Sequence, residues 1–224
     1  MALTAFYRST VGKKIVVAAT GVAMASFLLA HMLGNLQVFA GRGATPETTK
    51  LNEYAELLRT EMALLWVARL GLITAVVLHA VTVAQLAVRN RAARPTPYKV
   101  FRTSQASLAS RTMLWGGLAV LFYVVYHVLH FTVGSAHSDL FTPGDVYDNV
   151  VRSFQHPVIA LVYIAAQIAL FFHLSHGVQS AFRTLGVSHP GHISVVTKAG
   201  LAFAAIVTLG FVSVPVAVWA GLVR

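Results

Sequence analysis

Five long apolar stretches, separated by polar segments, dominate the hydrophobic pattern of the chain. They cover residues 15–40, 62–88, 112–134, 157–181 and 195–221. A helix needs about 20 residues to cross the hydrocarbon core of a bilayer, and each stretch reaches that length. The first stretch is too long for the apolar core of a secretory signal, so we expect it to stay in the protein. The pattern predicts an all-α fold: one membrane domain over residues 1–224, built as a bundle of five transmembrane helices.

Charged residues are few, and their positions alternate along the chain. Of the 224 residues, 57% are hydrophobic and 11% are charged, well below the roughly 25% charged residues of soluble domains. Basic residues precede the first span and fill the second and fourth connections, whereas all seven acidic residues lie in the first and third. Because cytoplasmic loops carry an excess of lysine and arginine, we expect a cytoplasmic N-terminus and an external C-terminus. The net charge of +10 then reflects topology and contact with lipid or a soluble partner, not nucleic acid binding.

Two of the connections have informative patterns. In the first, Leu51, Tyr54, Leu57 and Leu58 recur at helical spacing, which predicts an amphipathic helix over about 48–60 at the outer membrane interface. The second, residues 89–111, contains two prolines and six basic residues and is expected to be an irregular contact surface. The third is polar and contains a Pro-Gly turn.

Histidines supply the candidate chemistry of the spans. Each of the first four spans carries at least one and the fifth carries none; they are His31, His79, His127 with His130, and His173 with His176. Polar groups are costly inside a membrane, so each needs a partner. A lone histidine could simply hydrogen-bond a neighbouring helix, but four helices with histidines favour a shared ligand. The chain has no cysteine, so thiolate ligands are excluded.

Spacing from the basic residues places four of these histidines at two depths. His79 and His173 each lie ten residues before an arginine, about 15 Å from the inner boundary. His31 and His127 lie seventeen and sixteen residues after a basic residue, about 25 Å from it. A zinc site would need a third protein ligand, whereas a haem iron can be held by two imidazoles at one depth, with glycines giving the ring room. Two stacked electron-transfer haems are therefore expected.

The segments STVGKKIVVAATG, AHMLGN, VLHAVTVAQL, YHVLHF and HLSHGVQSAFRTLG occur in this order. They resemble the dihaem cytochrome b membrane anchor of succinate dehydrogenases and menaquinol fumarate reductases. The resemblance implies two haem b groups, the outer held by His31 and His127 and the inner by His79 and His173. It also implies flavoprotein and iron–sulfur subunits as partners, a quinone substrate with menaquinone expected, a prokaryotic cytoplasmic (inner) membrane, and a possible higher oligomer of the complex.

Other polar residues are candidates for supporting roles. His130 and His176 lie three residues from a predicted ligand, and we expect them to hydrogen-bond a carbonyl, a haem propionate or water. Arg69 could bind an outer haem propionate, or equally reach the interface by snorkelling. Three further residues could bind propionates or act only as topology signals: Arg183, Arg111 and Lys14.

The quinone site is less defined by the sequence. Family members that oxidise menaquinol use a glutamate near the start of the second helix, and Glu53 is the candidate here, although its spacing does not match. Asn35 and Gln37 could bond a quinone carbonyl or cap the first helix.

Two other functions stay open at this point. One is a dihaem cytochrome b anchor for a different quinone-linked dehydrogenase, such as a formate or hydrogen enzyme. The other is a proton channel or transporter that uses the histidines as a relay and holds no haem. In the favoured interpretation the chain is an electron-transfer subunit of a succinate:quinone oxidoreductase and performs no dicarboxylate chemistry alone.

Overall fold

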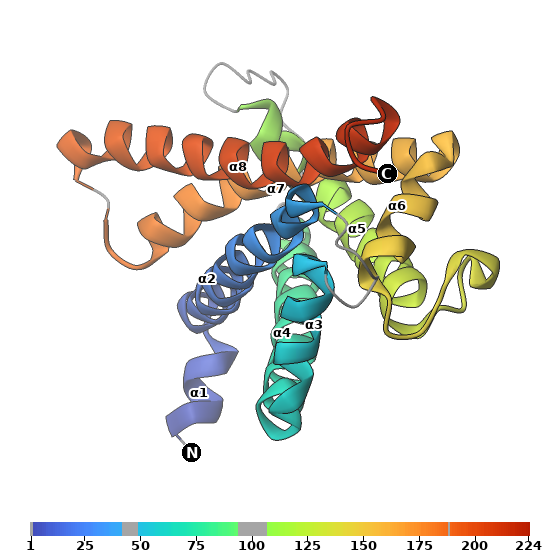
Figure 1. The fold of residues 1–224 in the computed structure, drawn as a ribbon. Helices are drawn as coiled ribbons and strands as arrows, with labels where there is room; N and C mark the ends of the chain where they lie inside the picture. Colours follow the sequence, from blue (N-terminus) through green and yellow to red (C-terminus); the bar gives the residue numbers. More distant parts are fainter. Residues whose placement is uncertain (1, 42–48, 94–106, 188) are drawn as a thin grey trace.

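The computed structural model describes residues 2–41, 49–93, 107–187 and 189–224, and these residues form helices without any strand (Figure 1). Within these ranges, five helical segments are long and apolar enough to cross a membrane. They are α2 (Thr10–Asn35) with the 3-10 helix η1 (Leu36–Ala40), α4 (Met62–Ala92), α5 (Leu108–Val128) with the π-helix η3 (Leu129–Val133), α7 (Pro157–Thr184) and α8 (Pro190–Trp219). The prediction of an all-α bundle with five membrane-spanning helices is confirmed.

The spans differ from their predicted bounds mainly at one end. At the end where basic residues gather, every helix runs three to five residues beyond the apolar stretch, as at Thr10 rather than 15 and Ala92 rather than 88. In α2, α4, α5 and α7 the added residues include lysine or arginine, which are good helix formers and extend a helix that hydropathy alone would end. The α8 helix instead begins at Pro190, a residue suited to the first helical position. Ser9 and Ser107 fix two starts by accepting hydrogen bonds from Gly12 N and Ser110 N. We call this end of the bundle the basic end and the opposite one the acidic end.

Among the described residues, four shorter helices lie in the connections and at the N-terminus: α1 (Ala2–Arg8), α3 (Lys50–Thr60), η4 (Ser138–Leu140) and α6 (Val146–Gln155). The α3 helix falls within the amphipathic segment expected at 48–60. The α6 helix is not among the predicted elements, although its buried Tyr147, Val150, Val151 and Phe154 recur at helical spacing. Residues 42–48, and residues 94–106 of the connection expected to be an irregular contact surface, lie outside the described part of the chain.

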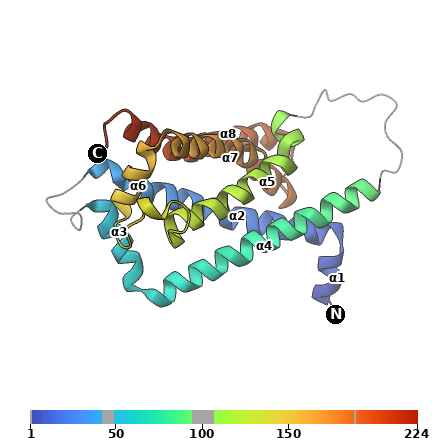
Figure 2. The same cartoon turned by 90° about the vertical axis from the view of Figure 1, so that its right-hand side faces the viewer.

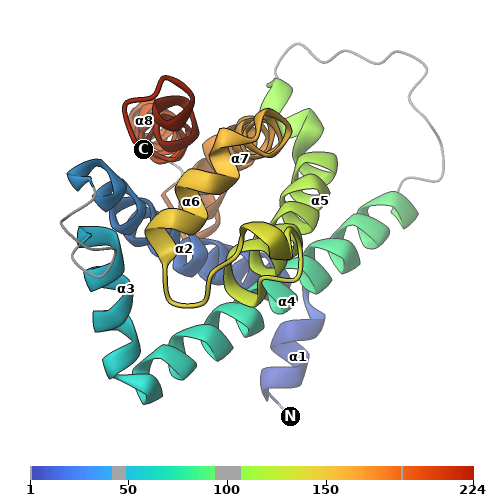
Figure 3. The same cartoon turned by 45° about the vertical axis from the view of Figure 1, so that its right-hand side comes forward.

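The long helices are arranged as a bundle with its two termini at opposite ends (Figure 2). The α7 helix packs against α5 and α8, and α2 packs against α4, α7 and α8. Figure 3 shows α8 on the far side of α2 and α7 from α4. The α2, α4, α5 and α7 helices, which carry the candidate ligands, are therefore joined through the contacts of α2 and α7. The α8 helix packs against those two, and its histidine, His192, lies in its first turn at the basic end.

Burial is uneven between the helices. A hydrophobic cluster at the acidic end joins α6, α7, α8 and η1, with Val38, Phe154 and Tyr163 among its members. A second cluster in the middle joins α2, α7 and α8. By contrast, Thr82 is the one buried residue of α4, and α5 has none over Leu108–Val128. The outward apolar side chains of α4 and α5 are suited to contact with lipid.

Candidate functional site

The four histidines predicted as metal ligands lie in two pairs, each formed across two helices. The rings of His31 (α2) and His127 (α5), the outer pair, have centroids 5.8 Å apart. Those of His79 (α4) and His173 (α7), the inner pair, are 6.3 Å apart. When two imidazoles bind the same metal ion from opposite sides, each through a bond of about 2 Å, their ring centres lie about 6 Å apart. Both pairs thus have the spacing of a site with a single metal between two rings.

The rings of the inner pair lie against glycines of neighbouring helices. A Cβ atom on Gly21 of α2 would lie 3.4 Å from His79 Cε1, and one on Gly117 of α5 would lie 3.2 Å from His173 Cε1. The second distance is shorter than an ordinary carbon–carbon contact. Glycine at these positions therefore leaves the space that the two imidazoles occupy.

Hydrogen bonds orient one ring of the inner pair and not the other. Thr20 Oγ1 donates to the Val16 carbonyl at 2.7 Å and lies 3.1 Å from His79 Nδ1, so it can accept the hydrogen of that ring nitrogen. This leaves His79 Nε2 for a metal, the usual arrangement of a ligating histidine. His173 Nδ1 is buried without a partner among the described residues. An unsatisfied buried nitrogen is unusual in a protein, and it fits a site whose ligand supplies the missing interaction.

The outer pair is connected to a chain of polar side chains. The Tyr163 hydroxyl of α7 lies 3.5 Å from His127 Nδ1 and 3.0 Å from His130 Nδ1. His130 is 1% exposed, and its Nε2 lies 3.0 Å from Ser153 Oγ of α6. His130 belongs to the π-helix η3, a distortion that is often found at functional sites. This series of hydrogen bonds thus links His127 to Ser153 of α6 through the side chains of Tyr163 and His130.

The partners of these histidines are mostly not predicted from the sequence. Tyr163 lies ten residues before His173, which puts it at the depth of the outer pair, so the same spacing could have indicated it. Ser153 is missed because α6 is not among the predicted elements, although the helical spacing of Tyr147, Val150, Val151 and Phe154 could have indicated this helix. His130 bonds two side chains, whereas a carbonyl, a propionate or water was expected. His176, the other surplus histidine, is half-buried in α7.

The basic residues considered for propionate binding lie away from the pairs. Arg69 is exposed and its guanidinium lies 5.2 Å from the Trp66 ring centre, which suits snorkelling to the interface. Lys14, Arg111 and Arg183 are exposed at the basic end. Among the contacts of the described residues, none joins these four to a paired histidine. It is the neighbouring Lys13 that is buried, with 5% of its surface exposed.

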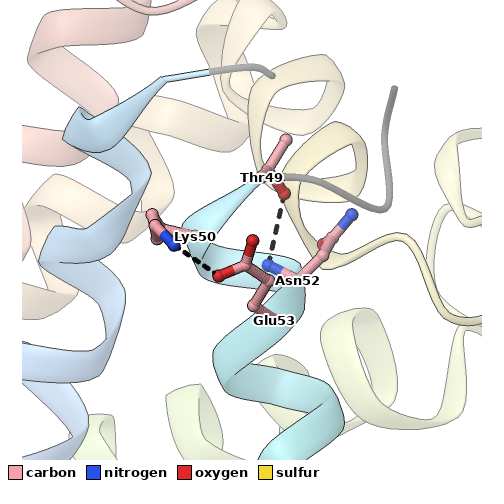
Figure 4. Close-up of polar contacts among 4 residues, drawn as sticks. All are labelled: Thr49, Lys50, Asn52 and Glu53. Carbon is pink, nitrogen blue, oxygen red and sulfur yellow. Dashed lines mark hydrogen bonds and ion pairs between the residues drawn. The ribbon is translucent and has the colours of Figure 1, made fainter. Parts of the chain in front are cut away.

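The quinone candidates differ in their surroundings. Figure 4 shows the Glu53 carboxylate paired with Lys50 at 2.6 Å, in the first turn of α3, which Thr49 caps by accepting from Asn52 N. An open pocket of about 720 Å³ beside α3 is lined by Glu56 and Arg59 among others, but Glu53 is not among its lining residues. Asn35 is next to the outer pair: its Nδ2 donates to the His31 carbonyl at 2.7 Å and lies 3.3 Å from Nε2 of that ring.

Gln37 completes the quinone candidates and is half-buried in η1.

Across the described ranges, no group of three or more His, Cys, Asp or Glu side chains could hold a metal ion. A three-ligand zinc centre therefore has no counterpart in that part of the chain. A metal at either pair would have to bring most of its own ligands, as the iron of haem does with its porphyrin nitrogens, so the residues present fit haem.

Comparison with known families gives independent evidence. The model of the succinate dehydrogenase/fumarate reductase transmembrane subunit family matches residues 89–217. The chain belongs to this family. The match includes His127 and His173 and begins after His31 and His79. No curated protein and no solved structure matches the chain. The family resemblance expected from the sequence is confirmed, and the chain is a transmembrane subunit of the succinate dehydrogenase/fumarate reductase type.

Proposed function

We propose that this family member holds two b-type haems and carries electrons between an iron–sulfur subunit and a quinone, with menaquinone the expected one. The observation that supports the proposal is the presence of two histidine pairs, drawn from four helices, at 5.8 and 6.3 Å. A haem with two axial imidazoles has no open iron position and supplies one-electron transfer. The His31–His127 pair would hold the outer haem, and the His79–His173 pair the inner haem.

The surrounding residues position these ligands. Thr20 can accept the hydrogen of His79 Nδ1 and so leave Nε2 for the metal, and the Tyr163 hydroxyl can act in the same way on His127. Gly21 leaves room for His79. Fixing a ligand ring before the metal binds reduces the entropy lost on binding and sets how strongly the ring donates to the metal.

The quinone site is proposed to lie beside the outer pair. Asn35 is the candidate there, because its amide already reaches His31. Gln37 is a further candidate in the next turn. Glu53 is the least supported, because Lys50 already binds its carboxylate. The basic end is proposed to face the cytoplasm of a prokaryote, where it would bind the flavoprotein and iron–sulfur subunits that carry out the dicarboxylate chemistry.

Haem quantification tests the proposal. The full-length chain, purified with its accompanying subunits, is expected to give a reduced-minus-oxidised spectrum of two low-spin b haems per chain. A protein without haem would refute the proposal and would instead favour a histidine relay. Co-purification with formate or hydrogen dehydrogenase subunits would contradict the proposed partners.

A pair of variants in α7 tests the ligand assignment. His173→Ala is expected to lose the inner haem, and His176→Ala, three residues away on the same helix, is expected to keep both. Retention of both haems in the first variant and loss of one in the second would overturn the choice of His173.

A further inference from the structure

An open pocket of about 570 Å³ lies at the basic end, between the start of α2 and the end of α4. It is lined by Lys13, Val81, Ala84, Gln85, Val88 and Arg89. At 100° per residue, Val81, Ala84 and Val88 lie about 140–180° around the axis of α4 from His79, whereas Gln85 and Arg89 lie about 80–120° from it. The apolar part of the lining therefore lies on the side of α4 that faces away from His79.

A buried ammonium group lies at this pocket. Lys13 Nζ donates to Gln85 Oε1 and lies 4.1 Å from the centre of the Tyr7 ring. The Tyr7 hydroxyl in turn donates to Gln85 Oε1 at 3.3 Å and bonds Thr82 Oγ1 at 3.1 Å. These contacts fix Lys13 between three helices, although only 5% of its surface is exposed. Burying a charge in this way is costly unless a charge of opposite sign lies near it.

The helices that form the pocket offer no such opposite charge. The sequences of α1, α2 and α4 contain no aspartate or glutamate. Arg89, also in the lining, adds a second positive group, and its Nη1 donates to the Arg8 carbonyl at 2.9 Å. The two cations are thus bonded to an amide and a carbonyl, which are neutral. An anion from outside these helices would lower the free energy of the buried charge.

The depth of the pocket indicates where that anion comes from. Lys13 lies three residues after the start of one span, and Arg89 three residues before the end of another, about 5 Å inside each helix end. Val81 and Val88, on the same face of α4, are 47% and 69% exposed. The two cations therefore lie at headgroup depth, above an apolar surface that suits an acyl chain.

We propose that this pocket binds an anionic phospholipid, with the phosphate near Lys13 and Arg89 and an acyl chain over Val81, Ala84 and Val88. The phosphate of such a lipid would supply the missing negative charge, and its acyl chain would cover the exposed apolar face of α4. The proposal requires a membrane-embedded chain and does not depend on the haem assignment.

Lipid titration followed by native mass spectrometry tests this site. The full-length chain, with its accompanying subunits, is titrated with phosphatidylglycerol and with phosphatidylcholine of the same acyl chains. Phosphatidylglycerol is expected to bind more tightly, and Lys13→Gln is expected to weaken it about tenfold or more, since the lost bond is charge-assisted. Lys198→Gln, an equal charge change at an exposed position of α8, is the matched control and should bind as the parent does.

A second variant guards against misfolding of the first. Ala84→Phe keeps every charge, lies on an exposed face and fills the groove, so it too should weaken phosphatidylglycerol binding. Normal binding by both Lys13→Gln and Ala84→Phe would overturn the proposal, as would equal affinity for the two lipids. Displacement of the lipid by millimolar inorganic phosphate would also overturn the proposal, because it would show that the site binds anions in general. Quinone found in place of phospholipid in the extracted protein would refute the assigned ligand.

Discussion

The Tyr163 hydroxyl connects a proposed haem ligand to a buried histidine, and removing it gives a measurable prediction. If His127 binds iron through Nε2, its Nδ1 carries the hydrogen and donates to the Tyr163 oxygen. That hydroxyl then donates to His130 Nδ1, and His130 Nε2 donates to Ser153. Tyr163→Phe deletes two of these three bonds and preserves the aromatic ring in its cluster.

The expected change is an increase in the midpoint potential of the outer haem. A ligand imidazole that donates a hydrogen bond is more basic and stabilises the oxidised metal, so removing its acceptor favours the reduced state. A neutral hydrogen bond contributes about 0.5–1.5 kcal/mol, which corresponds to about 20–65 mV for one electron. Because the bond from His127 is long, at 3.5 Å, the lower part of this range is expected. Leaving His130 Nδ1 unsatisfied should also cost about 1–3 kcal/mol of stability.

Spectroelectrochemical titration of the purified complex measures this shift, with the outer haem identified as the one that His127→Ala removes. Tyr126→Phe is the matched control, because its hydroxyl bonds the exposed His137 Nε2 at 3.0 Å instead of a proposed ligand. An unchanged or lower potential in Tyr163→Phe, with both haems retained, would refute the reasoning. So would an equal shift in the control.

Two further predictions concern the inner pair. Thr20→Val removes the acceptor 3.1 Å from His79 Nδ1 and should raise the inner haem potential by a few tens of millivolts, with Thr20→Ser restoring the parent value; equal potentials in all three proteins would contradict an orienting role. Gly117→Ala places a Cβ 3.2 Å from His173 Cε1, so the ring must shift and haem content measured by absorbance should fall. Gly116→Ala, whose Cβ would be 4.0 Å from its nearest neighbour, should keep its haem, and equal haem content in the two variants would show that the ring has room to spare.

Hydropathy and axial spacing predict the five spans and the two histidine pairs, because both depend on position along a helix. Hydropathy and axial spacing say little about the direction in which a side chain points around its helix axis. Lys13 and Lys14 are adjacent, yet one is buried and the other exposed, since a single residue turns the side chain by about 100°. The sequence indicates a basic residue at this depth, and only the packing of α1 and α4 selects Lys13.

The same limit explains the missed partners of His130. Tyr163 lies at a depth that the spacing could have identified, but its direction depends on how α7 packs against α5. Ser153 depends in addition on α6, which is too short to be found by a search for spans, although its apolar residues recur at helical spacing and Asp145 caps its start. Local capping and tertiary packing, both weak signals in a hydropathy profile, position these side chains.

The one-sided protein contacts of α4 have a consequence for the biogenesis of the subunit. Helices in a bilayer gain little from burying apolar surface against each other, since lipid is equally apolar, and associate through close packing and polar contacts. The α4 helix makes such contacts with α1 and α2, through Thr82 and Arg89 among others, but packs little against α5 and α7. A cofactor held by both His79 and His173 would join α4 to α7. Cofactor delivery would then be the step that completes the assembly of the newly inserted subunit.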